Sequence, residues 1–231
     1  MPEHPLIATM PPGTIGIPCS EQWRYAMFGM SLLGVQRPPG SIVSCQPGAN
    51  VAGNLNEIIK QLHGDWLWLI GDDHTMPVDI IPRLWAHDVD IVAPLCLRRS
   101  PPYLTVISTP PNERGELGVL PLDKCQGLMN VYAVGTAGML IKRRVLDGME
   151  PPWFRLGQIN PDLMSEDIEF CMRARKAGFD VWVDCDTTIG HIEPVVVQPV
   201  RDKATGEWRV GLDLGNRTIM ELKVTPPKET A

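Results

Sequence analysis

Two carboxylates and an imidazole directly follow a strongly apolar segment of the chain. Residues 66–70 are five consecutive large apolar residues, and Asp72, Asp73 and His74 come after a single glycine. Such a run is typical of a buried strand in a parallel sheet, and ligands bind at the carboxyl edge of such sheets. Because carboxylate and imidazole together suit a divalent ion such as Mn²⁺, the segment predicts metal-assisted chemistry on a diphosphate.

The spacing of this motif divides its residues between two tasks. Residues two apart on an extended chain point to one side, so Asp72 and His74 could share one ion. That ion would stabilise the charge on a departing diphosphate. Asp73 would then face a ribose hydroxyl or a base, although the division could also shift by one residue. On this motif alone a solvated turn is the favoured interpretation, since Gly-Asp-Asp is common in turns.

A second acidic group lies at the start of a helix predicted over residues 165–177. Ser165 is a natural N-cap, and Glu166 and Asp167 fall in the first turn, near the positive end of the helix dipole. A carboxylate at this position could take the proton from an attacking hydroxyl. The alternative is that these residues only stabilise the helix dipole, which accounts for most sequences of this kind.

A second histidine, His191, follows a strand predicted over residues 181–185. Its imidazole could complete the ligand set of a metal ion. For a single histidine, a hydrogen-bonded surface position is the more frequent role. The metal interpretation therefore requires that the fold bring His191 to the motif at residues 72–74.

The elements that must position these groups alternate along the chain. Helices follow from apolar residues at helical spacing and strands from short apolar runs. Strand–helix alternation predicts an α/β fold with a mostly parallel central sheet flanked by helices. The predicted strands are residues 14–18, 41–45, 66–70, 89–93 and 181–185, and the predicted helices are residues 21–36, 53–63, 79–87 and 165–177.

The remaining segments are less regular. We predict a strand at residues 104–108, a loop at 109–118, and a strand that runs into a tight turn within 131–140, where Gly135 and Gly138 interrupt the apolar run. The end of the chain suggests a hairpin of residues 195–200 and 208–212. The predicted organisation is a Pro-rich segment at 1–13, one domain at 14–194, and a tail at 195–231 appended to the same domain.

The composition of the 231 residues excludes several classes of protein. A net charge of −6 argues against an extended nucleic-acid surface. No stretch approaches the roughly 18 apolar residues of a membrane span, and the start of the chain lacks the pattern of a signal peptide. The six cysteines form no CxxC pair, so free thiols in a reducing cytoplasm are expected. The thiols expected to be buried are Cys45, Cys96, Cys171 and Cys185.

Taken in order, these segments resemble the family-two glycosyltransferases of the GT-A fold. Residues 53–74 are similar to the helix and strand that lead to the acidic metal motif of that family. Residues 134–143 are similar to its Gly-rich segment under donor sugar and acceptor. Residues 165–179 resemble its acidic acceptor-side helix, and residues 181–192 its closing strand and metal-contacting histidine.

The resemblance implies transfer of a sugar from a UDP- or GDP-linked donor to a hydroxyl of a glycan, lipid, protein or small molecule, with Mn²⁺ or Mg²⁺ as cofactor. It implies that Asp167 is the base of an inverting reaction and that Glu166 orients the acceptor or the base. The implied metal ligands are Asp72, His74 and His191. The implied donor-binding residues are Pro18, Cys19, Ser20, Asn54, Asp72, Asp73 and Gly138.

The chain departs from the family at two points, and two other functions compete with this one. His74 stands where the family usually has aspartate, and residues 44–47 lack the acidic residue that reads the base.

A nucleotidyltransferase would need a metal-binding aspartate in an earlier strand, and residues 14–18 and 41–45 offer none. A non-catalytic sugar- or nucleotide-binding module would keep the fold but lose the carboxylates, which are present here.

Overall fold

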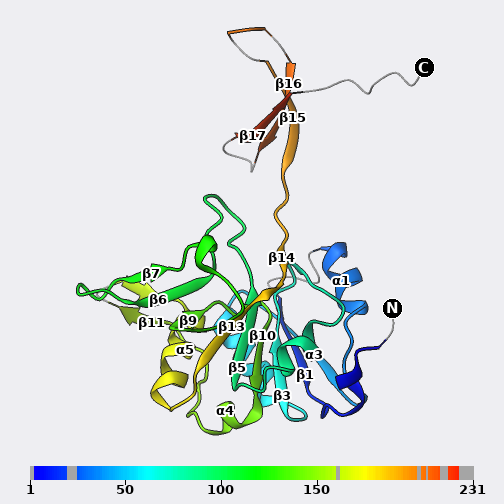
Figure 1. Ribbon diagram of the computed structural model, residues 1–231, viewed down its shortest axis with the longest axis vertical. Coiled ribbons are helices and arrows are strands. Elements are labelled where there is room, and N and C mark those ends of the chain that lie inside the picture. Colours follow the sequence, from blue (N-terminus) through cyan, green and yellow to red (C-terminus); the bar gives the residue numbers. More distant parts are fainter. Residues whose placement is uncertain are drawn as a thin grey trace. The chain divides into compact units, whose positions relative to one another are not determined.

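A computed structural model describes residues 3–19, 25–159, 162–201, 204–206, 208–213 and 218–223. The chain divides into two compact units (Figure 1). The first comprises Met1–Arg98 and Pro102–His191, and the second comprises Arg99–Pro101 and Ile192–Ala231. All the candidate site residues named above belong to the first unit.

A seven-stranded sheet forms the centre of the first unit, in the order β2-β1-β3-β10-β5-β13-β8. Strands β2, β1, β3, β5 and β13 run in one direction, whereas β10 and β8 run against their neighbours. The mostly parallel α/β sheet predicted from the sequence is therefore confirmed. The strands are β1 Thr14–Cys19, β2 Ile42–Pro47, β3 Trp66–Leu69, β5 Ile91–Leu95, β8 Leu128–Val131, β10 Met139–Lys142 and β13 Val181–Thr188.

Helices flank the sheet, and short strands form separate small sheets, β4-β14, β11-β12 and β7-β6-β9 (Figure 1). The α-helices are α1 Ala26–Leu33, α2 Val51–Lys60, α3 Ile80–Trp85, α4 Arg143–Asp147 and α5 Glu166–Lys176, with 3₁₀ turns at Pro5–Ala8 and Leu122–Lys124. The short strands are β4 His74–Thr75, β6 Ile107–Pro111, β7 Leu117–Val119, β9 Ala133–Val134, β11 Gly157–Ile159, β12 Asp162–Met164 and β14 Gly190–His191. Among the described residues, no helix has the length and apolar character needed to cross a membrane.

Strand β3 carries the site motif and is buried along its whole length. Both of its indole N–H groups have acceptors: Trp66 donates to the carbonyl of Pro11 at 2.8 Å, and Trp68 to that of Gly138 at 2.9 Å. A buried aromatic side chain with a satisfied polar atom adds a large apolar area to the core without a desolvation cost. The strand that ends at the motif is therefore firmly fixed between β1 and β10.

The first helix differs from its prediction. It covers Ala26–Leu33 instead of residues 21–36, of which 21–24 lie outside the described part. The apolar side chains noted at helical spacing, Met27, Met30 and Leu33, are 64%, 73% and 77% exposed, and Phe28 and Leu32 pack inward instead. Two apolar faces compete on this helix, so periodicity alone does not identify the buried one.

The region between β5 and α4 also differs from its prediction. The loop expected at residues 109–118 is largely a β-hairpin of β6 and β7, whose turn is held by Asn112, which accepts hydrogen bonds from the amides of Arg114 and Glu116. The strand expected within 131–140 is divided among β8, β9 and β10. Gly138, with a φ of +75°, turns the chain into β10, a conformation that glycine adopts at little cost.

The second unit contains the predicted hairpin and a strand that was not predicted. Val196–Arg201 (β15) pairs with Trp208–Asp213 (β16), and Thr218–Lys223 (β17) pairs with β16, all antiparallel. The third strand gives the hairpin the extra pairing that isolated two-stranded ribbons need for stability. That the tail belongs to the same domain as residues 14–194 stays a prediction.

Candidate functional site

The two histidines of the sequence analysis lie directly opposite each other. Strands β4 and β14 form a short antiparallel ladder in which His74 pairs with His191. Their rings stack with centroids 4.3 Å apart and an interplanar angle of 24°. Cys96, the residue after β5, joins them, so that one potential ligand atom from each of the three lies within 4.8 Å of the others. The cluster lies where β3, β5 and β13 end, at the carboxyl edge of the sheet.

Asp73 holds both imidazoles with one carboxylate. Its Oδ1 lies 2.9 Å from Nδ1 of His74, and its Oδ2 lies 3.3 Å from Nε2 of His191. The other nitrogen of His191, Nδ1, donates to the carbonyl of Leu97 at 3.0 Å. The sequence analysis expected Asp73 to face the nucleotide, whereas the structure places its carboxylate against the two rings.

One nitrogen of His74 has no hydrogen-bond partner. Nδ1 contacts the carboxylate of Asp73 and the carbonyl of Gly71 at 3.2 Å, both acceptors, so it carries the proton. Nε2 is buried and has no partner among the described residues. A buried polar atom of this kind is costly unless a ligand satisfies it. The orientation imposed by Asp73 leaves Nε2 as the atom that can coordinate a cation once it has lost its proton.

Charge within the cluster is strongly coupled. Burial alone would lower the pKa of His74, but Asp73 and Cys96 outweigh it and raise that pKa to about 9. The same balance raises the pKa of His191 to about 10. Burial alone would raise the pKa of Asp73 and of the Cys96 thiol, but the two histidines outweigh it and lower both pKa values. The cluster therefore holds two acidic groups, Asp73 and Cys96, and two basic ones, His74 and His191. A bound cation can replace protons of these groups.

Asp72 is buried but is not one of the three residues grouped as potential ligands. Its negative charge is among the causes, after burial and Cys45, that raise the pKa of Cys19 at the end of β1. The chain turns at residues 72–73, so the alternation argument that placed Asp72 and His74 on one side does not apply. Asp72 is therefore nearer the residues predicted to hold the nucleotide.

The predicted nucleotide residues gather at the ends of β1 and β2. Asn54 donates from Nδ2 to the carbonyl of Gly48 at 2.9 Å and to that of Cys19 at 3.4 Å, and so ties the two strand ends together. Pro18 and Cys19 are the last residues of β1, whereas Ser20 lies outside the described residues. These contacts give Asn54 a structural task whether or not a nucleotide binds.

The cysteines are free, with different exposures from those expected. All six are unpaired thiols, and Cys96, Cys171 and Cys185 are buried as predicted. Cys45 is exposed instead, because β2 is the edge strand of the sheet. Its Sγ lies 2.9 Å from that of Cys19 on β1.

Glu166 and Asp167 begin α5, as the sequence predicts. The Ser165 hydroxyl makes no capping bond to the backbone; it donates to the carboxylate of Asp167, which also accepts from the amide of Ile168 at 2.8 Å. Asp167 faces Gly135, since a Cβ built there would lie 3.3 Å from its Oδ2. Burial, ahead of the charge of Asp167, raises the pKa of Glu166.

The segment from Gly135 to Gly138 links the acidic helix to the histidine cluster. Asp167 lies beside its first glycine. A Cβ on Gly138 would lie 2.8 Å from Pro94 and 3.4 Å from Ile189, which stand two residues before Cys96 and His191. The predicted Gly-rich segment thus contacts both groups of candidate residues or their chain neighbours, Asp167 at Gly135 and the residues before Cys96 and His191 at Gly138.

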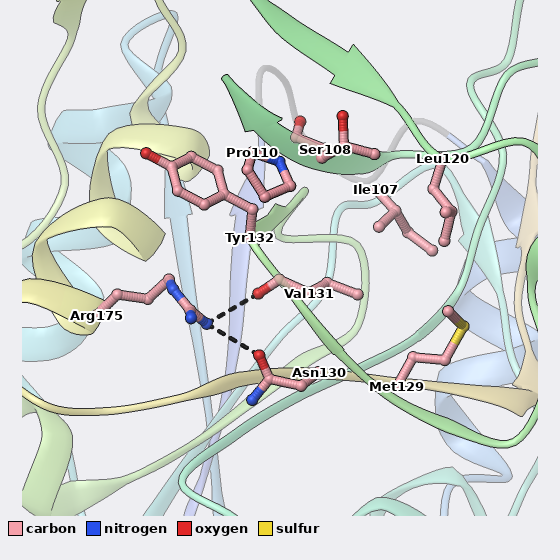
Figure 2. A pocket seen from close by; sticks show the side chains of 10 residues that line it. Ile107, Ser108, Pro110, Leu120, Met129, Asn130, Val131, Tyr132 and Arg175 are labelled. Atoms are coloured by element: carbon pink, nitrogen blue, oxygen red, sulfur yellow. Dashed lines mark hydrogen bonds between the residues drawn. The ribbon is translucent and has the colours of Figure 1, made fainter. Parts of the chain in front are cut away.

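Two cavities lie away from these residues. One, of about 220 Å³, is lined by the β6–β7 hairpin, β8 and Arg175 of α5, whose guanidinium donates to Asn130 Oδ1 at 3.1 Å and to the carbonyl of Val131 at 3.0 Å (Figure 2). The other, of about 460 Å³, lies beside Asp65 and Lys142 at the opposite edge of the sheet. The candidate site is therefore defined by its polar cluster and not by either of these cavities.

Cys96 is the residue that the sequence analysis missed as a functional candidate. It was assigned only to the buried thiols. The available signal was its position, since it follows a predicted parallel strand in the same way as the motif at residues 72–74 follows another. Parallel strands end at one edge, so such residues are neighbours in space.

The fold is that of the GT-A glycosyltransferases. The chain is similar to the crystal structure of A197 from STIV, with a TM-score of 0.55, 14% identity, and 78% of this chain and 84% of that chain covered. It is also similar to the crystal structure of GalNAc-T7 with UDP, GalNAc and Mn²⁺, with a TM-score of 0.56 and 11% identity, over 78% of this chain and 43% of that chain.

The chain belongs to the glycosyltransferase-like family 2, whose model matches residues 34–205. This agrees with the resemblance found in the sequence. No curated protein matches the chain. Family membership supports glycosyl transfer as the general class of activity.

Proposed function

We propose that the chain transfers a sugar from a nucleotide-diphosphate donor to an acceptor hydroxyl, with a divalent cation bound at the carboxyl edge of the sheet. The observation that carries the proposal is the pairing of His74 with His191 in the β4–β14 ladder, with one buried ring nitrogen left unsatisfied. An isolated turn motif or an ordinary surface histidine would not produce this arrangement.

The residues present fit a divalent cation. One potential ligand atom from each of two imidazoles and a thiol lies within 4.8 Å of the others. The carboxylate of Asp73 orients the ring of His74 through Nδ1, whereas Nε2 of His191 would exchange its contact with Asp73 for the cation while Nδ1 keeps its bond to Leu97. Asp72, whose charge acts on Cys19 at the end of β1, would face the nucleotide. When bound, the cation would act as a Lewis acid toward the diphosphate leaving group. Of the ions expected from the sequence, Mn²⁺ suits imidazole ligands better than Mg²⁺, which prefers oxygen, and GalNAc-T7, a structure of similar fold, holds Mn²⁺ together with UDP.

Asp167 is the proposed base of an inverting reaction, with Glu166 beside it. Its carboxylate is held by Ser165 and by the amide of Ile168, and it faces Gly135 at the start of the segment that leads to the cluster. A base fixed by such contacts can accept the proton of an acceptor hydroxyl at a defined position. Pro18, Cys19, Asn54 and Asp72 would then hold the nucleotide of a UDP- or GDP-linked donor.

A donor screen tests the proposal. The protein is incubated with Mn²⁺ and each common UDP- and GDP-linked sugar, and the release of free nucleotide is followed. We expect slow cation-dependent hydrolysis of one donor. Asp167→Asn should abolish transfer while nucleotide binding stays nearly unchanged, because a base acts only in the chemical step. Asp147→Asn, an exposed change in α4, serves as the matched control. Nucleotide binding without any turnover would favour a non-catalytic binding module.

A further inference from the structure

The thiol of Cys96 is the unexplained member of the cluster. Three strand ends contribute one side chain each: His74 after β3, Cys96 after β5 and His191 after β13. Cys96 is only 1% exposed, so it is not a surface thiol. Its backbone carbonyl accepts from the amide of Val106 and its thiol approaches the carbonyl of Leu97 at 3.4 Å, which is a weak contact for a sulfur donor.

Packing alone does not account for a thiol at this position. A buried cysteine usually serves as a small apolar side chain among other apolar ones. Here its neighbours are two imidazoles, which are in turn held by the carboxylate of Asp73. An apolar group would leave the buried Nε2 of His74 without any partner, whereas a thiolate and that nitrogen can be satisfied together by one cation.

We propose that Cys96 is a thiolate ligand of the cation site and gives it a preference for thiophilic ions such as Zn²⁺ and Co²⁺ over Mn²⁺ and Mg²⁺. Thiolate and imidazole together are typical ligands of tetrahedral zinc, whereas Mn²⁺ and Mg²⁺ are held mainly by oxygen. The inference rests on the proposed function only in placing a cation at this site, and it requires no glycosyl transfer.

Cobalt reports directly on a thiolate ligand. Co²⁺ is titrated into the metal-free protein of residues 1–231, and the near-ultraviolet absorption that arises from thiolate-to-cobalt charge transfer is recorded. The wild-type protein should show this band, and Cys96→Ser should lose it. Cys125→Ser is the matched control, because Cys125 is a partly exposed thiol outside the cluster, and it should keep the band. A band of unchanged strength in Cys96→Ser would overturn the proposal.

Competition measures the preference itself. The affinities of wild type and Cys96→Ser for Zn²⁺ and Mn²⁺ are compared by displacement of Co²⁺. The ratio of the Zn²⁺ affinity to the Mn²⁺ affinity should be about tenfold or more lower in Cys96→Ser than in wild type, as expected for the loss of one metal-binding partner. An unchanged ratio would contradict the assignment of Cys96 as a ligand.

X-ray absorption of the zinc-loaded wild type tests the proposal even if Cys96→Ser does not fold. One sulfur at about 2.3 Å and nitrogens at about 2.0 Å are expected, and a spectrum without sulfur would overturn the proposal. The outcomes also separate the two claims. A thiolate–cobalt band without any sugar transfer would leave Cys96 a ligand and remove the proposed activity, whereas transfer supported by Mn²⁺ without sulfur ligation would do the reverse.

Discussion

At the scale of single residues, the carboxylate of Asp73 orients the two histidine rings of the candidate cation site. Asp73 bonds to Nδ1 of His74 and to Nε2 of His191. Both rings are therefore fixed before any ligand arrives, so less ordering has to accompany binding. The motif of two carboxylates and an imidazole thus contains a residue, Asp73, that acts through its neighbours.

Replacing Asp73 tests this positioning. Asp73→Asn should lower the affinity for a divalent cation by about 10- to 100-fold, because the amide cannot hold both rings as the carboxylate does. Calorimetric titration of Co²⁺ measures the change. Asp65→Asn, which alters an exposed carboxylate at the opposite edge of the sheet, should leave the affinity unchanged. Equal affinities of Asp73→Asn and wild type would show that the rings need no such support.

Asp184 gives a pH-dependent prediction at the same scale. Burial opposes ionisation of this carboxyl, but the ring of His87 at 2.9 Å, the side chain of Thr187 and the amide of Asp186 outweigh burial and lower its pKa. A lowered pKa in the folded state means that the ionised carboxylate adds stability above its unfolded pKa of about 3.9, and that this stability is lost as the pH falls through the folded pKa.

Asp184→Asn should therefore reduce the free energy of unfolding by about 1–3 kcal/mol at neutral pH, and the difference from wild type should shrink below about pH 4. Urea denaturation across this pH range measures both effects. Asp186→Asn, which changes an exposed neighbour on the same strand, is the control. A difference that persists unchanged at low pH would mean that ionisation is not the source of the stability.

At the scale of elements, the antiparallel strand β10 is inserted between β3 and β5, and Gly138 makes the turn into it. The left-handed φ of +75° and the approach to Pro94 are two separate demands for glycine at this position. Gly127 has a similar φ of +56°, but a Cβ there would meet nothing within 4 Å. Substitutions at Gly138 and Gly127 can therefore be compared to separate the cost of backbone strain from the cost of steric overlap.

Gly138→Ala should lower the free energy of unfolding by more than about 1 kcal/mol, and by more than Gly127→Ala does. The reason is that Gly138→Ala adds a clash with the ring of Pro94 to the strain that both changes share. Urea denaturation of the two variants is the measurement. Equal losses would mean that the turn relaxes without strain at Pro94.

Much of the fold could be predicted from the sequence, and the exceptions have physical causes. Apolar runs such as residues 66–70 identify buried strands, and the period of α2 identifies its buried face. The direction of β10 cannot be inferred this way, because a buried strand has the same composition in either direction. The carboxylates and histidines of the site stood out by residue type, whereas Cys96 did not, because a buried cysteine resembles any small apolar residue until the three strand ends are seen together.

At the scale of the whole molecule, every described residue of the candidate site belongs to the first compact unit, including Asp167 and the cluster of His74, Cys96 and His191. The second unit consists of residues 99–101 and 192–231 with its own three-stranded sheet. Separate internal contacts of this kind are typical of parts that fold independently.

A chain that ends after Pro194 should therefore keep cation binding within about twofold of residues 1–231, because the ligand residues all belong to the first unit, which has its own internal contacts. Calorimetric titration of Co²⁺ and circular dichroism of the two chains make the comparison. A truncated chain that stays folded but no longer binds the cation would show that the second unit contributes to the site.

The central claim is that His74 and His191 hold one cation that in turn helps to bind a nucleotide diphosphate. Titration of UDP and GDP into the metal-free protein, with and without added divalent cation, tests it most directly. At least one nucleotide should bind about tenfold or more tightly with the cation present, as electrostatic pairing with a diphosphate requires, and the double variant His74→Ala/His191→Ala should lose this gain. Equal affinity with and without cation, or a gain that survives in the double variant, would contradict the account.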